Sequence, residues 1–196
     1  MKIPQLILAS QSPRRKILLK QIGLKFRVHP SNIQEDIDRN TSPTDNARRI
    51  ALQKAVEVAA LFECAIIVGA DTIVVLGNRI LGKPVSTSDA KRMLRLLSGR
   101  QHTVITAIAI VDSQSRRHVV LEEKTRVKFR KIRESEIARY VASGSPMDKA
   151  GAYGIQDDYG AVFVERVNGC FYNVVGFPLS RFHSAYYEFL KELQYR

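Results

Sequence analysis

Residues 6–23 read LILASQSPRRKILLKQIG. The apolar run at residues 6–9 is typical of a short buried strand. A polar turn follows, in which Ser12 is suited to cap a helix and Pro13 to occupy its first position. Gly23 is suited to end that helix. This stretch therefore predicts a strand, a tight turn and a helix.

The same alternation of strands and helices continues along the chain. The patterns predict further strands at residues 26–29, 65–76, 104–111, 119–129 and 161–167. They predict further helices at residues 45–62, 89–97, 134–143 and 178–194. Residues 147–160 are rich in glycine and polar side chains and are expected to be irregular. The class is therefore α/β, with a mixed twisted sheet flanked by helices, and the lack of repeats and linkers predicts a single domain over residues 1–196.

The chain is strongly basic, because 31 Lys and Arg against 19 Asp and Glu give a net charge of +12 over 196 residues. This charge favours an anionic partner such as nucleic acid, an acidic lipid or a phosphorylated small molecule, or it serves solubility alone. Two cysteines are too few for a disulfide framework and indicate a reducing compartment. Cys64 precedes an apolar run and is expected in the core. No signal peptide or membrane span is recognised, so a cytoplasmic protein is expected.

The turn after the first strand has the residues that a phosphate group needs. Arg14 and Arg15 fall in the first turn of the expected helix, where the helix dipole and free backbone N–H groups already favour an anion. The hydroxyl groups of Ser10 and Ser12 add donors. The alternative is an ordinary surface helix whose arginines are solvated.

Two further charged residues lie at positions that are expected to be apolar or buried. Lys54 falls between Ile50 and Val58 on the apolar stripe of its helix, so it either extends to the surface or points into a cleft. Asp71 follows the apolar strand run at residues 65–70. Ligands of open α/β sheets gather beyond the carboxyl ends of strands, which suits Asp71 to bind a metal or activate water. The alternative is an aspartate that accepts backbone hydrogen bonds at a strand end.

Two loops are weaker candidates. Lys83 lies in the stiff turn Gly82-Lys83-Pro84, and the loop at residues 149–156 contains glycines that allow a ligand to approach the backbone. Each loop alone is better explained as an ordinary surface turn. The sequence has no phosphate-binding P-loop, no dinucleotide fingerprint and no zinc-ligand spacing.

Taken together, these segments resemble the Maf family of nucleotide pyrophosphatases. The matching stretches are residues 8–15, 69–72, 82–84, 97–99, 148–156 and 173–178, and they occur in the family's order over nearly the whole chain. The resemblance implies a single Maf/ITPase-like α/β domain with a central cleft, usually paired as a homodimer. It also implies hydrolysis of the bond between the α- and β-phosphates of a nucleoside triphosphate with a divalent metal, Mg²⁺ or Mn²⁺.

The resemblance assigns a role to each matching residue. It implies Asp71 and Glu35 as catalytic carboxylates, with Asp71 as the general base, and the same two residues as the metal ligands. It implies Lys54 and Lys83 as further catalytic residues. The residues implied to bind substrate are Ser10, Arg14, Arg15, Thr72 and Gln156. Lys149 lies in the same loop as Gln156.

Three positions distinguish the branches of the family by substrate. Arg14, Thr72 and Gln156 resemble the branch that prefers dTTP and UTP, whereas the branch that prefers 7-methyl-GTP has Trp, Gln and Glu there. The amide of Gln156 offers both a donor and an acceptor to a pyrimidine edge. Asp157 stands where the family usually has glycine and bears on the shape of this loop.

Alternatives to a dTTP/UTP pyrophosphatase remain. One is a 7-methyl-GTP-type pyrophosphatase. Another is a nucleic-acid-binding module, which the net charge suggests but which scattered basic residues and the lack of an aromatic-rich strand disfavour. A third is a regulator of cell division, because the family has been linked to septum formation.

Overall fold

The computed structural model describes residues 4–156 and 159–195. Its strands are β1 Gln5–Leu8, β2 Phe26–Val28, β3 Ala65–Leu76, β4 Arg79–Leu81, β5 Gln101–Asp112, β6 His118–Phe129 and β7 Val164–Asn168. Its α-helices are α1 Pro13–Gln21, α2 Pro43–Ala59, α3 Thr87–Leu97, α4 Glu134–Ala142, α5 Phe171–Val175 and α6 Leu179–Glu192. Three short 3-10 helices complete the set: η1 Ser145–Asp148, η2 Ala150–Ala152 and η3 Tyr159–Phe163.

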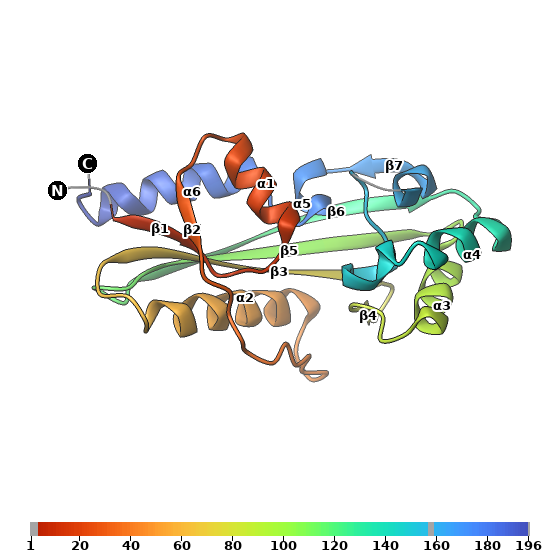
Figure 1. Ribbon diagram of the computed structural model, residues 1–196, viewed down its shortest axis with the longest axis horizontal. Coiled ribbons are helices and arrows are strands. Elements are labelled where there is room, and N and C mark those ends of the chain that lie inside the picture. The colour runs from red at the N-terminus through yellow and green to blue at the C-terminus, as the bar shows by residue number, and fades with distance from the viewer. Residues whose placement is uncertain (1–3, 157–158, 196) are drawn as a thin grey trace. The chain divides into compact units, whose positions relative to one another are not determined.

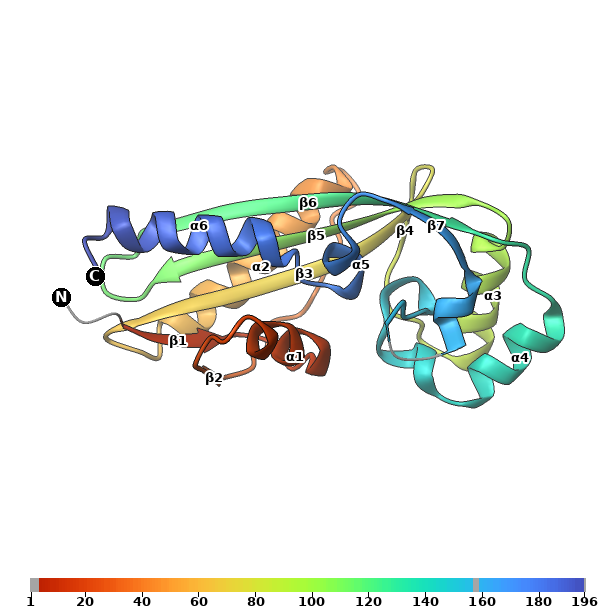
Figure 2. The ribbon, with the colours of Figure 1, turned by 90° about the horizontal axis from the view of Figure 1, so that it is seen from above.

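The strands form one sheet in the order β2-β1-β3-β5-β6-β7, with β4 paired to β3 (Figure 1). β1 is parallel to both β2 and β3, whereas β4 is antiparallel to β3 and β7 is antiparallel to β6. The three longest strands, β3, β5 and β6, lie side by side in Figure 2. The expected α/β class with a mixed sheet and flanking helices is therefore confirmed.

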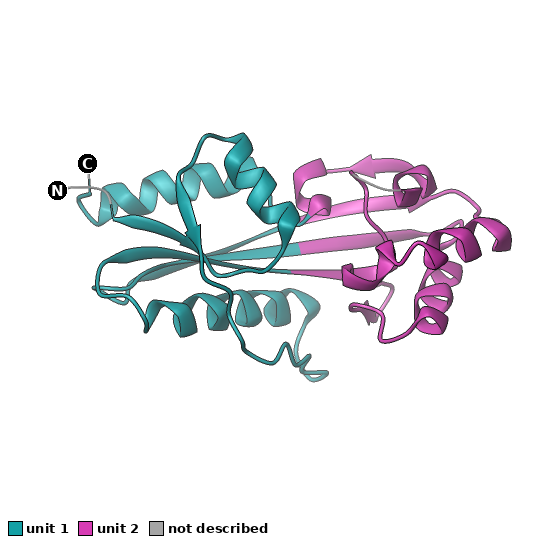
Figure 3. Cartoon of the chain, viewed as in Figure 1, with its two compact units in different colours: residues 1–71, 106–123, 176–196 teal, residues 72–105, 124–175 magenta. Residues whose placement is uncertain are grey.

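The chain forms two compact units (Figure 3). Unit 1 contains residues 1–71, 106–123 and 176–196, and unit 2 contains residues 72–105 and 124–175. Strands β3, β5 and β6 each contribute residues to both units. The expectation of a single domain with a central cleft stays a prediction.

Helices cover both faces of the sheet in unit 1 (Figure 1). Successive residues of β6 show this directly, because Glu122 pairs with Arg48 of α2 and Glu123 pairs with Arg181 of α6. Side chains alternate between the faces of a strand, so α2 and α6 lie on opposite faces.

The close approach of α2 to β3 depends on Gly69. A Cβ atom at this position would collide with the backbone carbonyl of Ala51 and come within 2.8 Å of the backbone nitrogen of Ala55. Glycine in a strand interior often marks such a close backbone approach. As a result, Lys54, which lies next to Ala55 in α2, reaches the β3 residue two positions after Gly69.

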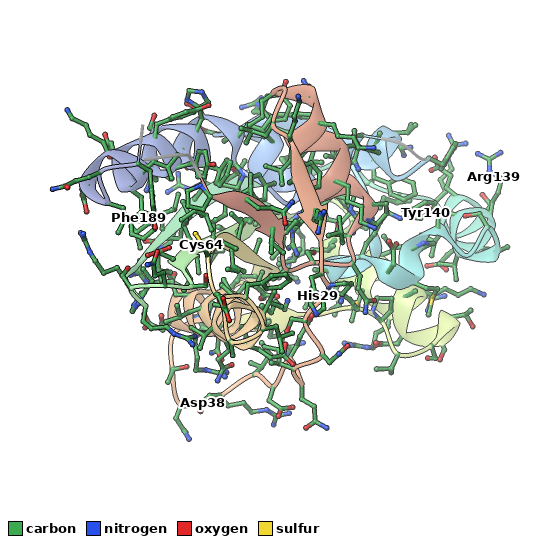
Figure 4. All side chains as sticks on the ribbon, turned by 60° about the vertical axis from the view of Figure 1, so that its left-hand side comes forward. His29, Asp38, Cys64, Arg139, Tyr140 and Phe189 are labelled. Atoms are coloured by element: carbon green, nitrogen blue, oxygen red, sulfur yellow. The ribbon has the colours of Figure 1, made fainter. Side chains whose placement is uncertain are left out.

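Unit 2 has its own apolar core. Aromatic side chains make up much of it: Phe129, Tyr140, Tyr153 and Phe163 are all buried. Tyr140 is inward-facing on α4, while the neighbouring Arg139 extends from the outside of this helix (Figure 4) and stacks over the ring of Tyr159.

Several element predictions were wrong in detail. Residues 147–160 are not wholly irregular, because η1 and η2 lie within or overlap them. The last predicted strand begins later, at Val164, because residues 159–163 form η3. Neither β4 nor α5 was predicted, since three to five residues are too few to show a strand or helix period.

Cys64 is exposed rather than part of the core. Helix α2 ends at Ala59, earlier than predicted, and the side chain of Leu61 is also exposed. Cys64 therefore lies in the turn before β3, and the apolar run becomes buried only from Ala65 onward. No helix in the described part of the chain is long and apolar enough to cross a membrane.

Candidate active site

The centre of the candidate site is the ammonium group of Lys54. Its Nζ lies 2.9 Å from Oδ1 of Asp71 and 2.8 Å from Oε1 of Glu35. The side chains of Lys54 and Asp71 are only 8% and 7% exposed, whereas that of Glu35 is 39% exposed. Lys54 therefore does not extend to the surface, and three residues that the sequence predicted for the site converge on one point.

Asp71 follows the apolar run at residues 65–70, but it lies inside β3 rather than at the end of a strand. β3 continues to Leu76, but its parallel pairing with β1 ends at the pair Leu8–Val68. The chain of β1 turns away just there, so Asp71 lies beyond the carboxyl end of its parallel neighbour. The rule that ligands gather at the carboxyl ends of parallel strands applies to this place even though β3 is longer.

Arg15 is buried and joins three segments of unit 1. Its Nη1 donates to Oγ of Ser10 at 3.0 Å and to the carbonyl oxygen of Ala70 at 2.9 Å, and its Nε donates to the carbonyl oxygen of Gly176 at 3.0 Å. Oγ of Ser10 also accepts a hydrogen bond from the backbone nitrogen of Ser12. The alternative of a solvated surface arginine is therefore wrong for Arg15.

The charge of Arg15 is balanced by the neighbouring carboxylates. Burial lowers the pKa of its guanidinium below the ordinary value, while Asp71 and Glu35 raise this pKa and Arg14 lowers it. Arginine keeps its charge at neutral pH even so. Unit 1 thus holds the cations of Arg15 and Lys54 beside the anions of Asp71 and Glu35.

The other predicted site residues have more exposed positions. Arg14 is half-buried in the first turn of α1, and Thr72 is half-buried directly after Asp71 in β3. Lys83 and Gln156 are exposed in unit 2. The structure brings the loops of these last two together, because the backbone nitrogen of Gly151 donates to the carbonyl oxygen of Gly82 at 3.0 Å.

Lys149 and Asp157 are the other two residues of this loop that the sequence singled out. Nζ of Lys149 donates to the carbonyl oxygen of Ser145 and pairs with Asp148 at 2.8 Å, so its side chain stabilises η1. Asp157, which the sequence analysis noted for the shape of this loop, lies outside the described residues.

Three residues that shape the site were not predicted from the sequence. The carbonyl groups of Ala70 and Gly176 hold Arg15, and no side-chain pattern signals a backbone acceptor. Gly69 could have been recognised, because a glycine inside an apolar strand often marks a close backbone approach, but it was considered only as part of a motif.

The described residues offer a pair of carboxylates, rather than a larger group, as metal ligands. No group of three or more His, Cys, Asp or Glu residues suited to a metal occurs among residues 4–156 and 159–195. Asp71 and Glu35 form a pair, which is the number of carboxylates by which Mg²⁺ is often bound together with substrate phosphates.

The fold and site define an α/β protein with a charged site beside the carboxyl ends of parallel strands. The model of the family described as Maf-like protein matches residues 5–189. This chain belongs to that family, as the resemblance in the sequence had implied.

Relatives of similar length have one name in common. A protein of Pelotomaculum thermopropionicum is 47% identical over 177 residues, covering 90% of this chain and 92% of the relative. A protein of Syntrophomonas wolfei is 48% identical over 174 residues, covering 89% and 92%. Both are named dTTP/UTP pyrophosphatase. Among solved structures, the Staphylococcus aureus Ham1 protein matches 64% of this chain and 71% of its own, at a TM-score of 0.39 and 13% identity, a likeness too small to bear on function.

Proposed function

We propose that this chain hydrolyses dTTP and UTP to the nucleoside monophosphate and pyrophosphate. The observation that carries the proposal is the buried ammonium of Lys54 held between Asp71 and Glu35. The relatives named dTTP/UTP pyrophosphatase support both the hydrolase class and the pyrimidine substrates.

We assign phosphate binding to the turn between β1 and α1. Oγ of Ser10 accepts two hydrogen bonds, from Arg15 and Ser12, which leaves its own hydrogen to donate to a phosphate oxygen. Arg14 adds a cation at the N-terminus of α1, where the helix dipole favours anions. Arg15 orients Ser10 from behind. From the family resemblance, we also assign Lys83 and the selectivity residues Thr72 and Gln156 to substrate binding.

A divalent metal is part of the proposal. The carboxylates of Asp71 and Glu35 already share one cation, and their oxygen atoms are the ligands that Mg²⁺ and Mn²⁺ prefer. A bound metal would neutralise charge on the phosphate oxygens. The charges of Arg15, Lys54, Asp71 and Glu35 cancel, so this cluster by itself adds no net positive charge against a triphosphate, which supports a metal there.

The chain's own residues account for the hydrolytic step. Asp71 takes a proton from a water molecule whose oxygen bonds to the α-phosphorus, the bond from that phosphorus to the oxygen bridging to the β-phosphate breaks, and pyrophosphate leaves with that oxygen. Lys54 holds the Asp71 carboxylate in position through its 2.9 Å contact. Preorganised cations stabilise the charge that develops on the phosphate oxygens.

The test is pyrophosphate release from a panel of dTTP, UTP, CTP, GTP and 7-methyl-GTP, with and without Mg²⁺ or Mn²⁺. We expect release from dTTP and UTP that depends on metal, and a loss of about 10²–10⁴-fold in the Asp71→Asn variant. Glu188→Gln, which changes an exposed carboxylate of α6 in the same unit, is the matched control. Full turnover by a folded Asp71→Asn protein rejects the assigned base, and preference for 7-methyl-GTP rejects the assigned substrates.

A homodimer in the cytoplasm is proposed along with the activity. The homodimer rests on the family resemblance, and the reducing compartment fits the free thiols of Cys64 and Cys170, the first of which is exposed. Light scattering and cell fractionation test the two statements.

A further inference from the structure

The loop before Gln156 has an unusual backbone. Gly151 has φ = +70° and Ala152 has φ = +61°, so two successive residues are left-handed. A side chain at Gly151 would press on Val74, and an alanine at positive φ is strained. Such a conformation persists only where surrounding contacts hold it. Something in unit 2 must therefore fix the chain just before Gln156.

Tyr153, the residue directly after the two left-handed positions, makes a buried contact with the core. Its side chain is buried, and its Oη lies 2.8 Å from Nε2 of His102. The rings of Tyr153, His102 and Phe129 pack edge to face, with centroids 4.7 to 5.4 Å apart. One residue further on, the backbone nitrogen of Gly154 donates to Oη of Tyr140 at 3.2 Å. Two buried hydroxyl groups thus hold the loop from the core side.

The hydrogen bond between His102 and Tyr153 is costly to bury. Within residues 4–156 and 159–195, Nδ1 of His102 has no hydrogen-bond partner. A buried polar atom without a partner costs free energy. Two phenylalanine rings would fill this space without that cost. What the polar pair adds over apolar packing is direction, because a hydrogen bond fixes where Oη of Tyr153 lies.

We propose that the His102–Tyr153 hydrogen bond positions the Gln156 loop, which makes both side chains positioning residues for selection of the pyrimidine base. The inference rests on the proposed function, in which Gln156 reads the base. Gln156 follows Tyr153 by three residues, so the position of Tyr153 limits where the amide of Gln156 can lie. Thymine presents an acceptor at O4, where cytosine presents a donor at N4. Discrimination between them requires an amide held in one orientation.

The experiment compares Tyr153→Phe, His102→Phe and the double variant with the unchanged protein. The readout is the ratio of kcat/KM for UTP to kcat/KM for CTP, because the fraction of folded protein cancels in this ratio. We expect the ratio to fall about threefold to tenfold in each single variant, the effect of one hydrogen bond. The double variant should lose no more than either single variant, because all three remove the same bond. Tyr186→Phe changes an equally buried tyrosine of unit 1 and should leave the ratio unchanged.

Amide hydrogen exchange at residues 152–156 provides a readout without turnover. We expect faster exchange in Tyr153→Phe and His102→Phe and unchanged exchange in Tyr186→Phe. An unchanged UTP-to-CTP ratio in the single variants overturns the role in base selection, and unchanged exchange overturns the anchoring itself. If the unchanged protein releases no pyrophosphate from any nucleotide, the proposed function fails, while exchange still decides whether the pair anchors the loop.

Discussion

Arg14 and Arg15 are neighbours in α1, yet their guanidinium groups have different surroundings. Arg15 is buried, and its donors bind Ser10 and the carbonyl oxygens of Ala70 and Gly176. Arg14 is half-buried at the first turn of the helix. The resemblance gave both the same role in substrate binding, whereas the contacts of Arg15 make it first a residue that positions others.

Substituting the two arginines should separate these roles. Arg14→Ala should raise KM for UTP by about tenfold or more, the effect of a lost hydrogen bond to a charged group, with little change in stability. Arg15→Lys cannot reproduce the forked contacts and should lower the free energy of unfolding by about 2–3 kcal/mol. Steady-state kinetics measures KM for UTP in both variants, and denaturant unfolding measures their free energy of unfolding. An Arg15→Lys protein as stable as the unchanged one contradicts the assignment.

Glu35 differs from Asp71 in being partly exposed, which suits a ligand that a metal reaches from solvent. Glu35→Gln should raise the Mn²⁺ concentration for half-maximal activity by roughly tenfold or more, because an amide is a weaker ligand than a carboxylate. Glu63→Gln, an exposed carboxylate in the same unit, is the control. A metal titration that is the same for Glu35→Gln and the unchanged protein argues against Glu35 as a ligand.

The contact between α2 and β3 decides whether the charged residues meet at all. Ser42 and Pro43 start α2, and the oxygen of Ser42 accepts from the backbone nitrogen of Asp45. The buried face of the helix includes Lys54 because α2 lies against Gly69. The predicted start at residue 45 was two residues late because the Ser42 cap was not recognised, and the distance between helix and strand could not be predicted from the sequence at all.

Adding a methyl group at Gly69 should push α2 away from β3. We expect Gly69→Ala to lower the free energy of unfolding by about 1–3 kcal/mol and to reduce turnover, because Lys54 moves with the helix. Gly82→Ala is the matched control, since a Cβ there meets nothing within 4 Å, and its stability should change by less than about 0.5 kcal/mol. Thermal unfolding of the two variants makes the comparison, and equal stability would contradict the close packing.

The stability of the whole chain should depend on pH through His102. Burial lowers the pKa of this imidazole to about 4 from its ordinary 6.5. Between these values the unfolded chain binds a proton that the folded chain does not. The free energy of unfolding should therefore fall as the pH is lowered from about 6.5 to about 4, and this contribution is constant above and below that window.

Thermal unfolding at pH 7 and pH 4.5 tests this dependence. The loss of stability at the lower pH should be smaller in His102→Phe than in the unchanged protein, because the proton-linked term is gone. His183→Phe, an exposed histidine of α6, should behave like the unchanged protein. The expectation is wrong if His102→Phe loses as much stability on acidification as the protein with His102.

The sequence alone was enough for the helix start at Pro13, the α/β class and the family, since caps, periodicity and motif residues are local and visible in the residue types. It also selected Lys54 and Asp71 by their places on apolar elements. The convergence of Asp71 and Glu35 on Lys54, and the binding of Arg15 to a carbonyl 161 residues away, came only from the folded chain. The physical reason is that packing distance and backbone acceptors depend on how distant segments meet, and every residue has the same carbonyl group, so no pattern of side chains reveals which one is used.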